Sequence, residues 1–119
     1  MQTKSLSSVR IFYPKFDKKE VLRILSERLK ELEARLSLVL VVLFGSYAKG
    51  NYTVGSDVDL LVVYRGERRD DVYALVKKVL DIPRLEPHLY TEEEYKEMRE
   101  TIDKMSRGGV VLLPKDERL

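Results

Sequence analysis

Residues 43–63 decide the fold of this chain and read LFGSYAKGNYTVGSDVDLLVV. They connect two strongly apolar runs, residues 38–44 (LVLVVLF) and residues 58–64 (VDLLVVY). Continuous β-branched runs of this length are typical of strands that are buried on both faces. The segment between them, residues 45–55, is rich in Gly, Asn, Thr and Ser and predicts a turn region. Because a parallel return needs a longer crossover, the two strands are expected to pair antiparallel.

Helical periodicity appears on both sides of this strand pair. Asp17 followed by Glu20 is a capping box, and the apolar stripe after it predicts a helix over residues 17–36. A second stripe predicts a helix over residues 72–80, which ends before Pro83. The first of these helices is amphipathic over its whole predicted length.

The remaining elements are shorter. Strands are predicted at residues 8–13, 84–90 and 110–113, and Pro87 favours either an edge position or a bulge for the second of these. A third helix is predicted over residues 91–107, after a second capping box. The order β-α-β-β-α-β-α-β predicts an α/β (α+β) fold with a mixed sheet of about four or five strands flanked by about three helices.

Bulk properties favour one domain over residues 1–119, with a motif core at residues 38–91 and a flexible tail at residues 115–119. The absence of cysteine excludes disulfides, thiol catalysis and cysteine zinc sites, and is compatible with the reducing cytoplasm that we expect for this chain. No apolar run approaches the ~18 residues that span a membrane. The net charge is only +2 although 35% of the residues are charged, so direct nucleic-acid binding is not indicated.

The acidic pair Asp57 and Asp59 is the first candidate for chemistry. Side chains two residues apart on a strand point to the same face, so both carboxylates are expected on one side of the sheet. Two such carboxylates repel each other unless a cation neutralises them, and Mg²⁺ is commonly held by one or two carboxylates together with substrate phosphates. The alternative is two solvated acids at the start of a strand.

A Gly-Ser turn upstream of this acidic pair favours a phosphate-binding site over two solvated acids. Gly45 permits close backbone approach, its neighbours offer amide donors, and Ser46 and Lys49 add a hydroxyl and a positive charge. The alternative is an ordinary turn in a hairpin. A P-loop is not supported, because Asn51-Tyr52 follows Gly50 where that motif has Lys and Ser or Thr, and a G-x-G-x-x-G motif is also absent.

The combination of a strand, a Gly-Ser turn and Asp-x-Asp opening another strand resembles the nucleotidyltransferase superfamily that includes DNA polymerase β. The fuller match, GSYAKGNYTVGSDVDLLVV, is similar to the archaeal and bacterial minimal nucleotidyltransferases. The resemblance implies that Gly45, Ser46 and Lys49 bind a nucleoside triphosphate such as ATP, with Ser56 in a supporting role. It also implies that Asp57 and Asp59 hold a two-ion Mg²⁺ site, with Mn²⁺ as the alternative metal.

Members of this superfamily have a third carboxylate on the next strand, which acts with the metals and helps to remove a proton from the attacking hydroxyl. The resemblance implies that Glu86 is this catalytic and metal-binding residue, with Asp81 as the second choice. His88 is either a partly exposed strand histidine, which we favour, or a group that contacts substrate or transfers a proton. For Tyr47 and Tyr52, packing and contact with a nucleotide or partner are equally favoured.

The resemblance further implies a partner, since small members of this family commonly work with a separate helical HEPN protein as the antitoxin to a ribonuclease toxin. The favoured function is therefore an enzyme that transfers AMP from ATP to a hydroxyl of that protein. The alternative is a non-catalytic antitoxin that binds nucleotide or neutralises its partner by binding alone. Transfer to a small molecule such as an aminoglycoside is the less favoured hypothesis, because it would need an added substrate domain. The sequence does not determine whether the chain forms a homo-oligomer.

Overall fold

The computed structural model describes residues 16–114 and contains a mixed four-stranded sheet in the order β3-β2-β1-β4. Its strands are β1 (Leu38–Phe44), β2 (Val58–Tyr64), β3 (Leu85–Thr91) and β4 (Val110–Leu113). β1 pairs antiparallel with β2 and with β4, whereas β2 and β3 are parallel. The predicted antiparallel pairing of the two apolar runs is confirmed. Pro87 lies in an edge strand of this sheet, where its missing N–H is tolerated.

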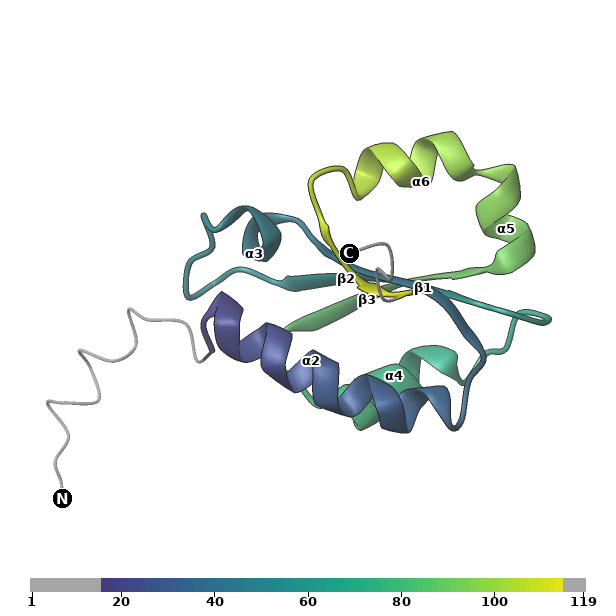
Figure 1. The fold of residues 1–119 in the computed structure, drawn as a ribbon, viewed down its shortest axis with the longest axis horizontal. Helices are drawn as coiled ribbons and strands as arrows, with labels where there is room; N and C mark the ends of the chain where they lie inside the picture. The colour runs from purple at the N-terminus through teal and green to yellow at the C-terminus, as the bar shows by residue number, and fades with distance from the viewer. Residues whose placement is uncertain (1–15, 115–119) are drawn as a thin grey trace, which may run out of the picture.

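Helices cover both faces of the sheet (Figure 1). They are α2 (Lys18–Glu33), α3 (Ser46–Lys49), α4 (Val72–Leu80), α5 (Glu92–Glu97) and α6 (Arg99–Met105). α2 and α4 lie against one face, and α5 and α6 lie over the other (Figure 1). The predicted α+β class is therefore confirmed. Among residues 16–114 no helix is long and apolar enough to cross a membrane.

The longest helix, α2, begins at the predicted capping box. The Asp17 carboxylate accepts from the amide of Glu20 at 2.8 Å, and the Glu20 carboxylate accepts from the amide of Asp17 at 3.0 Å. The helix ends at Glu33, three residues before the predicted end. Leu36 still packs into the core, with 4% of its surface exposed, because its amide folds back to the carbonyl of Leu32 at 2.9 Å.

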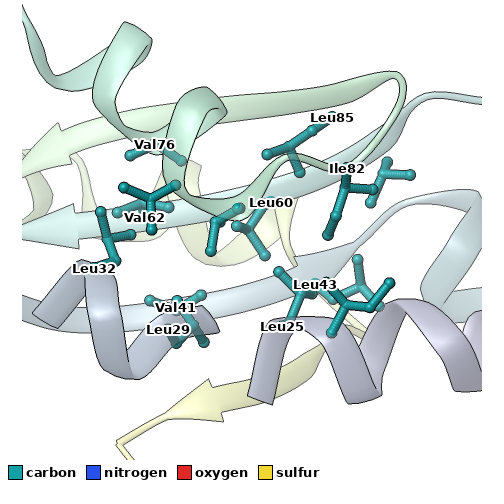
Figure 2. Packing of buried hydrophobic residues seen from close by; sticks show 14 of the residues in the cluster. Leu25, Leu29, Leu32, Val41, Leu43, Leu60, Val62, Val76, Ile82 and Leu85 are labelled. Carbon is teal, nitrogen blue, oxygen red and sulfur yellow. The ribbon is translucent and has the colours of Figure 1, made fainter. Parts of the chain in front are cut away.

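The main core lies between the sheet and the helices α2 and α4. Figure 2 shows Leu25, Leu29 and Leu32 of α2 facing Val41 and Leu43 of β1, with β2 and α4 completing the layer. A smaller cluster on the other face joins β1 and β2 to α6. β2 contributes to both clusters and is buried along nearly its whole length. Full burial of one leucine side chain contributes about 1.5–3 kcal/mol, so this strand is a major source of stability.

Two predicted elements differ from the structure. The third helix is divided at Met98 into α5 and α6, although the chain shows no Gly or Pro there. Its backbone hydrogen bonds continue through Met98, but φ −111° and ψ 21° at this residue bend the chain. The bend leaves Met98 41% exposed and buries Ile102 completely, so the apolar stripe does not form one straight face.

The predicted turn after β1 contains the short helix α3. It is bounded by two glycines with positive φ, Gly45 at 77° and Gly50 at 83°, and glycine adopts this conformation at little cost. The predicted strand at residues 8–13 and the predicted tail at residues 115–119 lie outside the described residues. The structure therefore gives four of the predicted strands and divides the predicted helical regions differently.

Candidate functional site

The turn after β1 brings the backbone of Gly45 against the carboxylate of Asp59. Phe44 pairs with Asp59 in the β1–β2 register, so the chain leaves β1 directly beside the start of β2. A Cβ added to Gly45 would lie 2.6 Å from Oδ2 of Asp59, which is closer than van der Waals contact allows. The backbone at Gly45 also has φ 77° and ψ −155°, a region that is essentially restricted to glycine. Both the space and the conformation therefore require glycine at this position.

Asp57 precedes β2 and forms an exposed ion pair with Arg84. Nη2 of Arg84 lies 3.0 Å from Oδ1 of Asp57, and each side chain is 54% exposed. The same guanidinium donates to the carbonyls of Gly55 at 2.8 Å and Ser56 at 3.2 Å, so it ties the loop before β2 to the turn before β3. Exposed pairs contribute about 0–1 kcal/mol, so Asp57 can exchange Arg84 for another cation at little cost.

Asp59 has a different partner, His88 of β3. The distance from Nε2 of His88 to Oδ1 of Asp59 is 3.1 Å, and both side chains are about one-third exposed or less, at 31% and 27%. The His88 ring also packs edge-on against Phe44, with ring centroids 4.9 Å apart. His88 is thus a partly exposed strand histidine, as expected, and the structure also places it beside an aspartate of the motif. The sequence carries no signal for this contact, because it depends on the register between two strands.

Glu86 lies on the strand next to Asp59 and opposite it in the parallel register. Paired residues in a sheet share a face, so the two side chains start from the same side of the sheet. Oε1 of Glu86 accepts a hydrogen bond from the hydroxyl of Tyr73 at 3.3 Å. Asp81, the second choice for the third carboxylate, is instead the exposed C-cap of α4, in the covering layer rather than in the sheet. The catalytic and metal-binding role of Glu86 remains a prediction.

The donor set suits Mg²⁺ in kind, because it consists of carboxylates on one sheet face. The side chains, however, do not converge into a complete metal site. Among residues 16–114, no three His, Asp or Glu side chains gather closely enough to hold one ion. Asp57 is paired with Arg84, and Asp59 with His88. A divalent ion that is held by Asp57, Asp59 and Glu86 would therefore have to replace both partners.

The other predicted nucleotide-binding residues lie around the same turn. Ser46 is half-buried at the start of α3, and Lys49 is exposed at its end. The hydroxyl of Ser56 accepts from the amide of Thr53 at 2.9 Å, so it closes the loop before β2. Nucleotide contacts by these three residues remain predictions.

Two tyrosines anchor the motif loop to the start of α2. The rings of Tyr47 and Tyr52 are stacked, with centroids 4.1 Å apart and an interplanar angle of 5°. The Tyr47 hydroxyl donates to the carbonyl of Phe16 at 2.9 Å, and burial raises the pKa of this hydroxyl. The Tyr52 hydroxyl accepts from the amide of Lys18 at 2.9 Å, and Nζ of Lys18 donates to the carbonyl of Ala48 at 2.8 Å. In this structure both rings therefore serve packing within the chain.

The mixed sheet with helices on both faces, and the segment that joins β1 to β2, are those of a nucleotidyltransferase domain. The chain belongs to the nucleotidyltransferase domain family, whose family model matches residues 19–110. The fold matches the crystal structure of a candidate nucleotidyltransferase from Sulfolobus solfataricus with a TM-score of 0.54 and 21% identity, covering 92% of this chain and 87% of that one. At this identity the match supports the fold alone. A search of curated proteins finds no match to the chain.

Proposed function

We propose that this protein transfers a nucleoside monophosphate, AMP from ATP in the first instance, to a hydroxyl group of a protein partner. Membership of the family supports nucleotidyl transfer in general. The observation that carries the proposal is the contact between the glycine turn and the sheet carboxylate, where a Cβ on Gly45 would lie 2.6 Å from Asp59. A phosphate group that is bound at the turn would therefore lie beside Asp59.

The turn offers donors for the triphosphate. Amides at the start of a helix have no intrahelical acceptor, so those of Ser46 and Tyr47 suit phosphate oxygens. The Ser46 hydroxyl adds a donor, and Lys49 adds a positive charge at the exposed end of α3. The hydroxyl groups of Tyr47 and Tyr52 tie this turn to the start of α2 through their hydrogen bonds with Phe16 and Lys18. Fixed donors of this kind stabilise developing charge without first having to reorganise.

Asp57, Asp59 and Glu86 are the residues that would hold Mg²⁺, with Mn²⁺ as an alternative. Such an ion supplies charge neutralisation on the phosphate oxygens when it is bound. In this structure Arg84 forms an ion pair with Asp57, and His88 hydrogen-bonds Asp59. These contacts keep the carboxylates on the sheet face to which the triphosphate must come.

In the proposed reaction, the acceptor oxygen attacks the α-phosphorus of the triphosphate. The bond from that phosphorus to the bridging oxygen breaks, and pyrophosphate leaves. Glu86, whose backbone pairs with Asp59 in the adjacent strand, takes the proton of the acceptor hydroxyl. Most of the acceleration is expected from positioning and from charge neutralisation, because the protein forms no covalent bond to the substrate.

We infer that the acceptor is another protein. Residues 16–114 form one sheet with its covering helices and include no separate substrate domain. The small nucleotidyltransferases that the motif resembles commonly work with a helical HEPN toxin. We therefore propose that this chain is the antitoxin of such a pair and adds AMP to a tyrosine hydroxyl of the toxin.

A binding-only function is the second candidate, and one observation favours it. Asp57 and Asp59 are engaged by Arg84 and His88, and within residues 16–114 the carboxylates do not gather into a three-ligand site. A domain in this state could bind nucleotide or neutralise its partner without transfer. The two candidates make different predictions for labelled nucleotide.

The test is incubation with Mg²⁺ and ATP labelled at the α-phosphate, with and without the product of a neighbouring gene that encodes a small helical protein. Label on the helical protein supports transfer. A stable complex that carries no label with any of the nucleoside triphosphates supports the binding-only function. If the helical protein carries no label and also forms no complex, the choice of a helical partner is contradicted.

Matched variants test the site itself. Asp57→Asn and Asp59→Asn should abolish transfer while the protein stays folded, and full activity in both would contradict the mechanism. Glu86→Gln should lower the rate by about 10²–10⁴-fold if Glu86 is the proton acceptor. Asp81→Asn is the control, because Asp81 is exposed with φ 48°, a conformation that asparagine also adopts. Loss in Asp81→Asn but not in Glu86→Gln would reverse the assignment of the third carboxylate.

A further inference from the structure

Tyr73 presents its hydroxyl to the carboxylate to which the proposed function gives the role of proton acceptor. It is the second residue of α4, and 43% of its surface is exposed. Its hydroxyl oxygen lies 3.3 Å from Oε1 of Glu86. An acceptor hydroxyl must occupy such a place, within hydrogen-bond reach of the group that removes its proton.

The contact depends on the position of β3 at the edge of the described sheet. Glu86 shares a sheet face with Asp59, and α5 and α6 lie over this face. Tyr73 belongs to α4, which packs along β3 and covers the opposite face (Figure 1). Because no strand among residues 16–114 lies beyond β3, the Tyr73 side chain can meet Glu86 around that edge.

The ammonium group of Lys77 lies over the Tyr73 ring. Nζ of Lys77, one turn further along α4, lies 5.6 Å from the ring centroid. A cation at this distance attracts the ring and favours one orientation for it.

We propose that Tyr73 is itself an acceptor, so that the protein modifies its own Tyr73 with a nucleoside monophosphate. Tyr73 Oη attacks the α-phosphorus of a bound nucleoside triphosphate, and its proton passes to Oε1 of Glu86. The bond between the α-phosphorus and the bridging oxygen breaks, and pyrophosphate leaves. The product is a phosphodiester that links the nucleoside to the Tyr73 oxygen. This inference rests on the proposed nucleotidyl transfer and on Glu86 as its proton acceptor.

The chain offers a matched comparison in Tyr95. The Tyr95 hydroxyl also donates to a carboxylate, Oδ1 of Asp103, at 3.0 Å, and the side chain is partly exposed. A cation is present here as well, since the guanidinium of Arg99 lies 5.6 Å from the ring centroid. Tyr95 lies in α5 and packs against the smaller core cluster of β1 and β2, and its hydroxyl pairs with Asp103 of α6 rather than with Glu86 of β3. If position at the site decides the modification, Tyr73 is labelled and Tyr95 is not.

The experiment uses the purified chain alone, with Mg²⁺ and each nucleoside triphosphate labelled at the α-phosphate in turn. Intact-mass measurement should show addition of one nucleoside monophosphate, and peptide mapping should place it on Tyr73. Tyr73→Phe should remove the label, Tyr95→Phe should retain it, and Glu86→Gln should slow its appearance. The first-order rate constant should not change when the protein is diluted about tenfold, because the reacting groups belong to one molecule.

The outcomes separate this inference from the proposed function. Label on Tyr95, label spread over several tyrosines, or a rate that falls on dilution would overturn self-modification at Tyr73. An unlabelled chain that still transfers label to the helical partner would overturn it as well, and would leave the proposed function standing. An unlabelled chain that also releases no pyrophosphate with the partner present would contradict both.

Discussion

Replacing Gly45 with alanine tests the contact on which the site depends. A Cβ at this position would lie 2.6 Å from Oδ2 of Asp59 and 3.4 Å from its Cβ and Cγ. The backbone strain of a non-glycine residue in this conformation costs about 1–3 kcal/mol. Crowding in a packed region adds about 1–3 kcal/mol. We therefore expect Gly45→Ala to lower the free energy of unfolding by about 2–6 kcal/mol.

Gly50 provides the control, because it also has positive φ, at 83°, but a Cβ there would meet nothing within 4 Å. Gly50→Ala should cost only the backbone strain, about 1–2 kcal/mol. Its transfer activity should remain near that of the unmodified protein. Gly45→Ala displaces the Asp59 carboxylate, and a misplacement of about 1 Å can cost about 10²-fold in rate.

The assays are urea denaturation for the free energy of unfolding and label transfer for activity. A double-mutant cycle with Asp59→Ala isolates the steric part, because that change removes the oxygen that the new Cβ would meet. Gly45→Ala should then cost less in the Asp59→Ala background than in the unmodified protein. Equal costs in both backgrounds, or equal losses for Gly45→Ala and Gly50→Ala, would refute the close approach that we describe.

Three further predictions concern stability. Glu94 has its pKa lowered from 4.5 to about 2 by the Arg68 guanidinium and the Thr91 amide, so its contribution is complete above pH 4.5 and is lost as the pH falls toward 2. Because this side chain is 36% exposed, the loss should stay below about 1 kcal/mol, and acid titration of stability in Glu94→Gln should lack it. Leu60→Ala, at a fully buried position, should cost about 2–5 kcal/mol in denaturant melts, and a cost under about 1 kcal/mol would contradict its place in the core. Tyr52→Phe removes the acceptor of the Lys18 amide and should cost about 0.5–1.5 kcal/mol in the same melts, whereas an unchanged melt would argue against the anchor.

The sequence predicts those parts of the fold that local patterns specify. The apolar runs of β1 and β2 and both capping boxes are found at the predicted residues, because each depends on neighbours within a few positions. The bend at Met98 could not be predicted in this way. The apolar spacing continues through Met98. Only the packing of Ile102 against β1 and β2 shows that α5 and α6 must run in different directions.

In the candidate site, too, the local features could be predicted and the long-range contacts could not. The Gly45 turn and the two aspartates follow from spacing within one segment, and the structure places Gly45 directly against Asp59. The contacts of His88 with Asp59 and of Arg84 with Asp57 join segments that are distant in the chain. They depend on the β2–β3 register and on the left-handed backbone at Arg84, with φ 61°. Neither property leaves a pattern in the sequence of either segment.

The strand order also has a consequence for the path of folding. β1 and β2 are joined by one loop and β3 returns through α4, but β4 reaches β1 only after every other described element has been made. Among the described residues, the outer edge of β1 therefore has no partner strand until residues 110–113 have left the ribosome. Unpaired edges of apolar strands recruit other chains. We expect nascent chains that are stalled before β4 to aggregate. Pairing of the four-residue strand β4 with β1 should then lower this tendency.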